Sequence, residues 1–515
     1  MNRLLSLILL LLTGLSHLQA QQQIAVDVLV FGATSGGVIA ASAAAKEGMT
    51  VILADPETHV GGMSSGGLGQ TDIGNKFAIT GMSRDFYRRI GAHYGKPEQW
   101  IFEPHVADSI FRTIIREDRI DHRPSYRLGK VIREGSVIRR IFFTDKSTGK
   151  RIAVSARMFI DCSYEGDLMA AAGVSYTIGR EANSVYGETW NGVQMLDKHQ
   201  FPDGVDPYVI PGNPSSGLIW GISPESLAAK GSGDRKLQAY NFRLCLTDRP
   251  ENRIPIGRPP RYESMKYELL LRQLKAYTPD SLNWQLMHFA WMPNHKTDIN
   301  NCGGFSTDMI GVNYAYPEAS EKERKKIIRH HEDYTKGLLY FIGNDPRVPE
   351  HLRNEMKRWG YPKDEYRNYS NFTPQLYIRE SRRMVGPYVM TQHNCQGREK
   401  VTDGIGLAAY TMDSHNCQRV VVNGMVKNEG DVQVGGFPPY PVSYRSIVPK
   451  PGEATNLLVP VCLSASHIAY GSIRMEPVFM VLGQAAATAA VMAIRANTTV
   501  QQVDVQALRR RLGME

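Results

Sequence analysis

The chain has 515 residues, 42% of them hydrophobic and 22% charged, with a formal net charge of +9. This length is enough for two or three domains with real cores, and no solenoid-like repeat or low-complexity linker interrupts it. The basic excess favours anionic substrates or surfaces. It forms no basic stripe and no nucleic-acid reader motif accompanies it, which argues against nucleic-acid binding.

The N-terminus predicts a secretory leader over residues 1–20. Arg3 supplies a charged start, Leu4–Leu12 an apolar core and Ala20 a small residue for cleavage. The apolar run is too short to span a bilayer, and we expect no other stretch of the required length. The sequence therefore predicts an exported bacterial protein, periplasmic or secreted, with no membrane span.

The segment behind the leader has the pattern of a βαβ dinucleotide-binding unit. An apolar strand over 26–31 enters a glycine turn, the turn opens an alanine-rich helix over 38–47, and a second strand over 50–54 ends on Asp55. Both strands, the helix and the acid are spaced as such a unit requires. The alternative is a glycine turn in an ordinary α/β protein.

The glycine turn reads G-x-T-x-x-G, because Thr34 stands where the usual motif has its middle glycine. Gly32 allows the tight turn, and Gly37 lets the helix pack close to the strand. The amides at the helix start and the helix dipole would meet a pyrophosphate. Asp55 is placed to accept hydrogen bonds from a ribose.

A glycine-rich segment, His59–Gly69, follows and suits either a backbone pressed against a ligand or a long flexible loop. Residues 82–118 then look helical, and 126–160 look like β-strands with a turn at 145–150. The last of these strands leads into a second strand–acid–small–helix unit, Asp161–Gly173, which we expect to return to the same sheet.

Residues 176–400 carry no glycine-rich cofactor signature and are rich in Tyr, Trp, Pro and Asn. Within them, 320–356 looks helical and charged on the outside. We interpret this region as an inserted substrate or cap domain, although its aromatic residues suit an ordinary core equally well. A final helix is predicted from about Val478 to Arg495, with Pro477 suited to its first position.

Three separated blocks resemble FAD-dependent oxidoreductases of the glutathione-reductase fold superfamily. The blocks are Gly32-x-Thr34-x-x-Gly37 with Asp55 and Gly61-Gly62, then Asp161-x-Ser163-x-x-Gly166-Asp167, then the Gly-Gln-Ala-Ala helix at Gly483. More narrowly, the chain is similar to a secreted bacterial group labelled FAD-dependent oxidoreductase, which is distantly similar to the flavoprotein core of the heterodisulfide reductase A subunit. Segments that begin at Asp298, Tyr377 and Asp413 are also similar to that group.

The resemblance implies an α/β fold with an α+β insertion: a Rossmann-like FAD/NAD(P)-binding domain with a central parallel sheet, a three-stranded β-meander and an inserted substrate/cap domain. The implied division is a leader at 1–20, FAD-binding parts at 21–175 and 401–515, and the cap at 176–400. The implied FAD contacts are Gly32, Thr34, Ser35, Gly36, Gly37, Asp55, Gly61, Gly62, Met63, Asp161, Ser163, Gly166 and Gly483. In this fold the final helix points its N-terminus at the flavin, where its dipole and the nearby Arg474 would stabilise reduced flavin.

Two departures from the family pattern stand out. The second block usually reads acid-Ala-Thr-Gly; here Ser163 can replace the Thr, while Tyr164 replaces the Gly and would alter the approach to the adenosine. Heterodisulfide-reductase-like relatives also carry cysteine clusters, whereas this chain has no C-x-x-C, so we expect no iron–sulfur centre.

A flavin that accepts a hydride from an alcohol or amine carbon needs a base for the heteroatom proton. His467, just before the closing helix, is the first candidate, and His415 with Asp413 is the second; each could instead be a structural histidine. Arg382 or the neighbouring Arg383 could bind an anionic substrate group. An internal Arg379–Glu380 ion pair is the alternative for that stretch.

The six cysteines allow one or two disulfides in an oxidising compartment. The sequence His-Asn-Cys-Gln occurs twice, and a Cys395–Cys417 disulfide or coincidence explains it better than zinc, so we predict no metal. His59 is a further candidate, for a covalent flavin tether.

We therefore expect an exported FAD oxidoreductase acting on a small-molecule substrate, a carbohydrate or related alcohol, with an unknown electron acceptor. The alternatives are a fumarate-reductase-like enzyme, in which Arg382, Arg474 and His467 hold carboxylates, and a non-catalytic binding protein on a flavoprotein scaffold.

Overall fold

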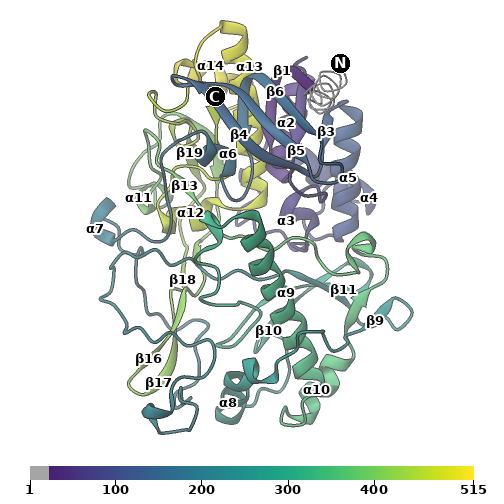
Figure 1. Cartoon of the computed structure of the whole chain (residues 1–515), viewed down its shortest axis with the longest axis vertical. Helices are drawn as coiled ribbons and strands as arrows, with labels where there is room; N and C mark the ends of the chain where they lie inside the picture. The colour runs from purple at the N-terminus through teal and green to yellow at the C-terminus, as the bar shows by residue number, and fades with distance from the viewer. Residues whose placement is uncertain (1–21, 515) are drawn as a thin grey trace, which may run out of the picture.

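The computed structural model describes residues 22–514, so the predicted leader at 1–20 lies outside the described residues. Figure 1 shows an upper half built around one large sheet and a lower half with a second sheet, with the long helix α9 (Glu321–Asn344) running down the middle. The N-terminal strand and the C-terminal helices both lie in the upper half, while the teal and green middle of the chain fills the lower half.

The upper sheet has seven strands in the order β3-β2-β1-β6-β5-β4, with β20 paired to β6. Its strands are β1 (Gln22–Phe31), β2 (Val51–Ala54), β3 (Asp121–Arg123), β4 (Tyr126–Glu134), β5 (Val137–Asp145), β6 (Arg151–Asp161) and β20 (Leu457–Leu458). β1, β2, β3, β6 and β20 pair in parallel, whereas β4, β5 and β6 form an antiparallel meander. The predicted α/β fold with a parallel sheet and a three-stranded meander is confirmed.

Small residues on two helices allow close packing in the upper half. Those helices are α2 (Ser35–Lys46) and α13 (Glu476–Ala496), and a Cβ at Gly483 would overlap the carbonyl oxygen of Gly36. The predicted helical segment 82–118 is two helices, α4 (Gly81–His93) and α5 (Pro104–Glu117), the second beginning on a proline.

Helix α13 corrects the expectation that no further stretch approaches the length of a membrane span. Among the described residues, this 21-residue helix alone is long and apolar enough to cross a bilayer. However, 89% of its apolar window is buried inside the structure. Its hydrophobicity is therefore explained by packing against α2 and the sheet.

The lower half holds a five-stranded sheet in the order β10-β11-β8-β12-β9. Its elements are β8 (Leu244–Thr247), β9 (Arg253–Pro255), β10 (Met287–Met292), β11 (Lys296–Asn301), β12 (Gly360–Pro362), α8 (Glu268–Ala276), α9 and α10 (Glu350–Lys357). The predicted helical segment 320–356 is thus α9 and α10, and α9 begins at a capping box between Ser320 and Glu323. The hairpin β16 (Gln418–Val422) and β17 (Met425–Glu429) also reaches into the lower half (Figure 1).

The remaining helices and strands are short. They are α3 (Gly62–Ser65), α6 (Asp167–Ala171), α7 (Asn183–Tyr186), α11 (Gln392–Cys395), α12 (His467–Ile473), α14 (Val505–Arg511), β7 (Tyr176–Thr177), β13 (Arg383–Met384), β14 (Gly404–Ala408), β15 (Met412–Ser414), β18 (Val432–Val434) and β19 (Tyr440–Ser443). The proposed domain division at 175 and 400 stays a prediction.

Candidate functional site

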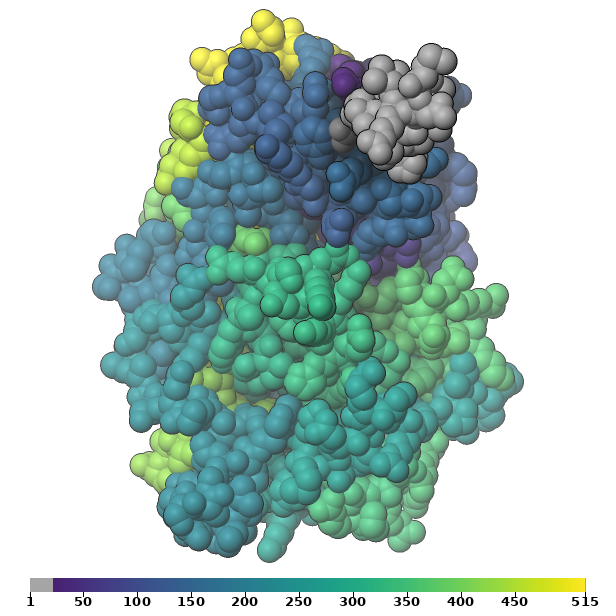
Figure 2. Space-filling view, viewed as in Figure 1, coloured from purple at the N-terminus to yellow at the C-terminus, as the bar shows by residue number. Residues whose placement is uncertain are grey.

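A cavity of about 820 Å³ lies where the carboxyl ends of β1 and β6 face the lower half. This volume is within the range of about 300–1,000 Å³ that small-molecule sites occupy. Its upper wall includes Gly32, Ala33, Thr34, Asp55, Gly62, Ser163 and Tyr164, and its lower wall includes Tyr316, Arg324, Tyr369 and Arg382. On the face shown in Figure 2, the blue atoms of the upper half adjoin the green atoms of the lower half.

The first fingerprint forms a cradle that side chains would fill. Gly32 has φ +98°, and a Cβ there would lie 2.6 Å from the Ser163 nitrogen. A Cβ at Gly37 would overlap the Gly32 carbonyl oxygen, and one at Gly36 would lie 2.8 Å from the Phe479 oxygen. The predicted roles of the glycines in turn formation and close packing therefore match the structure.

Thr34 has a use that a glycine would not have. Its Oγ1 accepts a hydrogen bond from the Gly37 nitrogen at 3.2 Å. Thr34 therefore caps the N-terminus of α2, which begins at Ser35. The same hydroxyl donates to the Cys162 carbonyl oxygen at 2.9 Å. Thr34 thus replaces the usual glycine with a helix cap that also links the first block to the second.

Asp55 ends β2 at the wall of the cavity. Its two carboxylate oxygens accept hydrogen bonds from the Ala33 and Glu57 nitrogens, both at 2.6 Å. Burial raises the pKa of Asp55 to about 7, although both amide bonds act to lower it. The side chain lies beside the fingerprint turn, as the ribose-binding prediction requires.

Tyr164 of the second block contacts the glycine-rich segment His59–Gly69. Gly61 precedes α3 with φ +89°, and a Cβ at Gly62 would overlap the Tyr164 hydroxyl. The Met63 nitrogen donates to that hydroxyl at 2.9 Å. His59, the candidate tether, lines the cavity and has its Nε2 3.0 Å from the Gly62 carbonyl oxygen.

Asp161 ends β6 and organises the second block. Its carboxylate accepts bonds from the Ser163 hydroxyl at 2.7 Å and nitrogen at 3.0 Å, and from the Met169 nitrogen at 2.7 Å. Burial raises its pKa to about 6, although these bonds act to lower it. Gly166, at φ +66°, begins α6. Asp161 therefore holds the turn in place through these hydrogen bonds, while Ser163 lines the cavity.

The sequence analysis missed Glu476, the first residue of α13. Its buried carboxylate accepts hydrogen bonds from Ser35 at 2.5 Å, Tyr164 at 2.6 Å and Ser64 at 3.2 Å. These hydroxyls come from the first block, the second block and the glycine-rich segment. Burial raises the pKa of Glu476, and the three hydroxyl bonds act against that rise. A lone glutamate before Pro477 carried no signal for this role.

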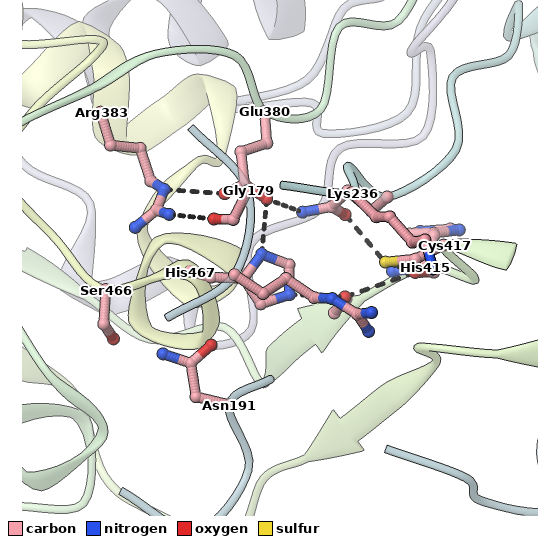
Figure 3. Close-up of polar contacts among 12 residues, drawn as sticks. Gly179, Asn191, Lys236, Glu380, Arg383, His415, Cys417, Ser466 and His467 are labelled. Carbon is pink, nitrogen blue, oxygen red and sulfur yellow. Dashed lines mark hydrogen bonds and ion pairs between the residues drawn. The ribbon is translucent and has the colours of Figure 1, made fainter. Parts of the chain in front are cut away.

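His467 belongs to a buried polar network next to these blocks (Figure 3). Its Nδ1 is 2.7 Å from a Glu380 oxygen, and its Nε2 is 3.0 Å from the Ser414 hydroxyl. Glu380 also pairs with Arg383 Nε at 2.7 Å. Burial acts to raise the Glu380 pKa, but Arg383 and the hydrogen bonds from His467 and Gln238 outweigh it and lower the pKa to about 2.

His415 lies between two carboxylates. Its Nδ1 is 3.0 Å from Asp308, and its Nε2 is 3.4 Å from Asp413. Burial and Arg379 act to lower the His415 pKa, but Asp413 and Asp308 outweigh them and raise it. The two carboxylates therefore favour the charged form of the imidazole, so His415 is better suited to donating a hydrogen bond than to acting as a base.

Gln238 joins the two histidines and Arg474 into one network. Its side-chain Nε2 donates to Glu380 at 2.9 Å. Its Oε1 accepts hydrogen bonds from the backbone nitrogen of His415 at 3.3 Å and from Arg474 at 3.2 Å. Arg474 also donates to Asp413 at 3.0 Å and to the Tyr377 hydroxyl at 2.9 Å. Sequence reasoning missed Gln238, because a glutamine in an irregular segment has no motif.

Arg382 lies apart from this network. It lines the cavity and pairs with Asp167 at 2.8 Å. The suggested Arg379–Glu380 pair is not among the ion pairs of the described residues; Arg379 instead pairs with Asp308 at 2.9 Å. The stretch Tyr377–Arg383 thus forms buried ion pairs, one within the stretch between Glu380 and Arg383 and others with partners distant in sequence.

The cysteine prediction needs correction. All six cysteines fall within the described residues, and all are buried free thiols, so the suggested Cys395–Cys417 disulfide is not formed. One group of side chains has the spacing of metal ligands: Glu103, His105 and Glu365. The Lys296 ammonium already pairs with Glu103 and Glu365, each at 2.7 Å, which accounts for this cluster without a metal.

Comparison with known proteins gives a family match over most of the chain. The family model described as FAD dependent oxidoreductase matches residues 27–512. A search of curated proteins found no match. Among solved structures, the chain is similar to the OxyS anhydrotetracycline hydroxylase from Streptomyces rimosus, at 10% identity and TM-score 0.25 over 35% of this chain and 36% of that one.

Two other solved structures are similar over comparable parts. A flavoprotein/dehydrogenase from Cytophaga hutchinsonii shares 17% identity, with TM-score 0.22 over 30% of this chain and 42% of that one. The flavin-dependent monooxygenase PieE, in complex with FAD and substrate, shares 16% identity, with TM-score 0.22 over 30% and 33%. The chain thus spans less than half the length of each of these structures, and the family match carries the assignment. This chain belongs to the FAD dependent oxidoreductase family, and FAD is its cofactor.

Proposed function

We propose that this FAD-dependent oxidoreductase is exported and oxidises a small polar donor, a carbohydrate or related alcohol. Oxidation of an alcohol carbon requires a group that takes the hydroxyl proton while the hydride leaves the carbon. Bound FAD supplies the two-electron acceptor for that hydride. The residues of this chain must therefore supply a base and groups that orient the hydroxyl.

The contact between His467 and Glu380 carries the proposal. Glu380, 2.7 Å from Nδ1, orients the imidazole with a proton on that nitrogen, so the neutral ring offers Nε2 as the proton acceptor. His415, whose charged form Asp308 and Asp413 favour, supplies the complementary hydrogen-bond donor. The two histidines thus have environments that separate their roles, with His467 as base and His415 as donor.

The fumarate-reductase-like alternative fits the structure less well. It requires Arg382, Arg474 and His467 to hold the carboxylates of one substrate. Arg382 pairs with Asp167, whereas Arg474 pairs with Asp413 in a separate network. Both guanidinium groups are therefore already neutralised by carboxylates of the chain itself. A non-catalytic binding protein would not require a cradle as complete as the one around Gly32 and Gly37.

Export and the choice of a carbohydrate are supported by other features of the chain. The leader pattern at 1–20 favours export, with the mature enzyme periplasmic or secreted. The aromatic-rich middle region and the association of the resembling group with glycan breakdown favour a carbohydrate.

The test is the absorption spectrum of the purified, periplasmically expressed protein during anaerobic additions of sugars, alcohols and amines. We expect flavin bands that bleach with a sugar or alcohol, and colour that returns in air if oxygen serves as acceptor. His467→Gln should slow bleaching by at least about 100-fold while the flavin stays bound, since general base catalysis contributes about that much. His93→Gln, at the exposed end of α4, is the matched control.

Bleaching by none of the donors, together with turnover of an unsaturated acid by the chemically reduced enzyme, would overturn the proposal in favour of the reductase. A purified protein that takes up no FAD would contradict every enzymatic reading.

A further inference from the structure

Trp284 is the most unusual exposed aromatic residue of the lower half. Its side chain is 63% exposed, and its φ of +64° is a left-handed conformation that bulky residues rarely adopt. The turn is held by hydrogen bonding, because the Trp284 nitrogen donates to the Met287 carbonyl oxygen at 2.8 Å. A strained backbone that presents a large aromatic ring to solvent points to a role in binding.

The indole of Trp284 is stacked on a second ring. The ring centroids of Trp284 and His288 are 3.7 Å apart, and the ring planes differ by 27°. His288 is half-buried in β10, so the indole rests on a fixed support. Burial and the positive charge of Arg243 lower the His288 pKa, which favours a neutral ring at this position. The pair therefore forms a flat, uncharged surface.

Hydrogen-bonding groups lie next to this surface. In the pairing of β10 with β11, His288 lies opposite Asn300 and Ala290 opposite Asp298, so the His288 and Asp298 side chains are on the same face of the sheet. Arg243 forms two hydrogen bonds of 2.7 Å with Asp298 and lies 3.6 Å from Asp72. The Asp72 side chain keeps 25% exposure, so its carboxylate can accept bonds from a ligand. With two acids beside one arginine, the surroundings favour a neutral ligand over an anionic one.

The same groups lead toward the proposed catalytic network. Tyr410 donates to the Asp72 carboxylate at 3.4 Å. Asp413, three positions beyond Tyr410 in the chain, accepts a hydrogen bond from Arg474 beside His415. Tyr410 thus connects Asp72 to the segment that holds the proposed catalytic network.

We propose that Trp284 and His288 form a stacking platform for one ring of a neutral carbohydrate. A pyranose has an apolar C–H face, which suits an aromatic surface, and a hydroxyl edge, which suits the exposed carboxylate of Asp72. The platform lies outside the buried network, so it would hold a ring of the carbohydrate other than the one that is oxidised. This inference deepens the proposed function and rests on it.

The chain offers a matched control in Trp291. This residue is 54% exposed and lies on the same strand, three positions beyond His288, so it faces the opposite side of the sheet. Its ring lies 5.5 Å from that of Trp359 instead. Removing Trp291 deletes a similar exposed indole without touching the platform.

The experiment measures carbohydrate binding to the FAD-loaded protein, separately from flavin bleaching. Neutral glucose-, galactose-, mannose- and xylose-based disaccharides are titrated into wild type, W284A, W284F and W291A by isothermal titration calorimetry. For the disaccharide that binds wild type, W284A should weaken affinity about tenfold, as loss of one aromatic contact predicts, and W284F should retain most of it. W291A should bind within about twofold of wild type.

Equal affinities of W284A and wild type, or no binding by any disaccharide, would overturn the platform. Bleaching distinguishes this failure from failure of the proposed function. A disaccharide that bleaches wild type and W284A with the same KM leaves the oxidation standing and removes the platform. A disaccharide that binds through Trp284 without bleaching supports the platform and removes the oxidation.

Discussion

The Tyr164 hydroxyl donates a 2.6 Å hydrogen bond to Glu476, which connects the turn after β6 to the start of α13. Glu476 also accepts a bond from Ser35, the first residue of α2. The start of α2 is where a cofactor pyrophosphate is expected to bind, since helix N-termini attract anions. The Glu476 carboxylate and the pyrophosphate would therefore compete electrostatically for one region of the protein.

This competition predicts that FAD affinity depends on the protonation of Glu476. Burial already raises the Glu476 pKa, and a nearby pyrophosphate would raise it further, so FAD binding should take up a proton. Affinity should fall as pH rises through the pKa of the apoprotein. Titration of apoprotein with FAD from about pH 5 to about pH 8, followed by flavin fluorescence, measures the dependence.

The variants E476Q and Y164F separate this explanation from others. E476Q should bind FAD with an affinity that varies little with pH. Y164F removes a bond that lowers the Glu476 pKa, so its pH dependence should move to higher pH. If FAD affinity depends on pH in the same way in E476Q and in wild type, another group is responsible for the dependence.

Thr34 should stabilise the fold through its cap on α2. Thr34→Ala removes the acceptor for the Gly37 nitrogen and should lower the free energy of unfolding by about 1 kcal/mol. Thr34→Ser keeps the hydroxyl and should remain close to wild type. Thr34→Gly should cost only a few tenths of a kcal/mol in capping, because glycine is tolerated at this position. Urea unfolding of the apoproteins measures the order; an alanine variant as stable as serine would contradict it.

The first βαβ unit could be predicted because its signals are local. Strand, turn, helix and acid lie within 26–55, and each has its own sequence pattern. The meander and α13 were also predicted, because alternation, turn residues and a continuous apolar run identify them. The division of 82–118 into two helices was missed, although Pro104 marks the start of the second.

The site network could be predicted only in part. His467 and His415 were selected as histidines near the closing helix, but nothing local indicates that Gln238 connects them. Likewise, Glu380 was assigned a neighbour in sequence, whereas its partners are Arg383 and His467. Partners in a buried network are chosen by tertiary packing, which brings together side chains more than 80 positions apart, as for Glu380 and His467.

Gly37 should be essential for FAD binding because no space exists for a side chain. A Cβ there would overlap the Gly32 carbonyl oxygen and also contact Cys162 at 3.1 Å. Gly37→Ala must therefore move α2 away from β1 and distort the turn that would hold the pyrophosphate. We expect the purified variant to lose most of its flavin, measured as the ratio of flavin absorbance to protein. Gly257→Ala, in open space, is the control and should keep full occupancy.

Protonated His415 should make stability depend on pH. Asp413 and Asp308 raise its pKa above 6.5, overcoming burial and Arg379. Its contribution is therefore fully present below about pH 6.5 and is lost as pH rises through the raised pKa. His415→Gln should lower the free energy of unfolding by at most about 3 kcal/mol at about pH 6, since Arg379 and Arg474 still pair with the two carboxylates.

At higher pH the wild-type imidazole becomes neutral and resembles the glutamine in charge, so the difference between the two proteins should shrink. Urea unfolding of flavin-free wild type, H415Q and the exposed-site control H93Q, from about pH 5.5 to about pH 9, measures the convergence. A difference between wild type and H415Q that stays constant over this range would mean that His415 acts through packing and neutral hydrogen bonds. A charged His415 would then be excluded, and the assignment of His467 as base and His415 as donor would lose its electrostatic basis.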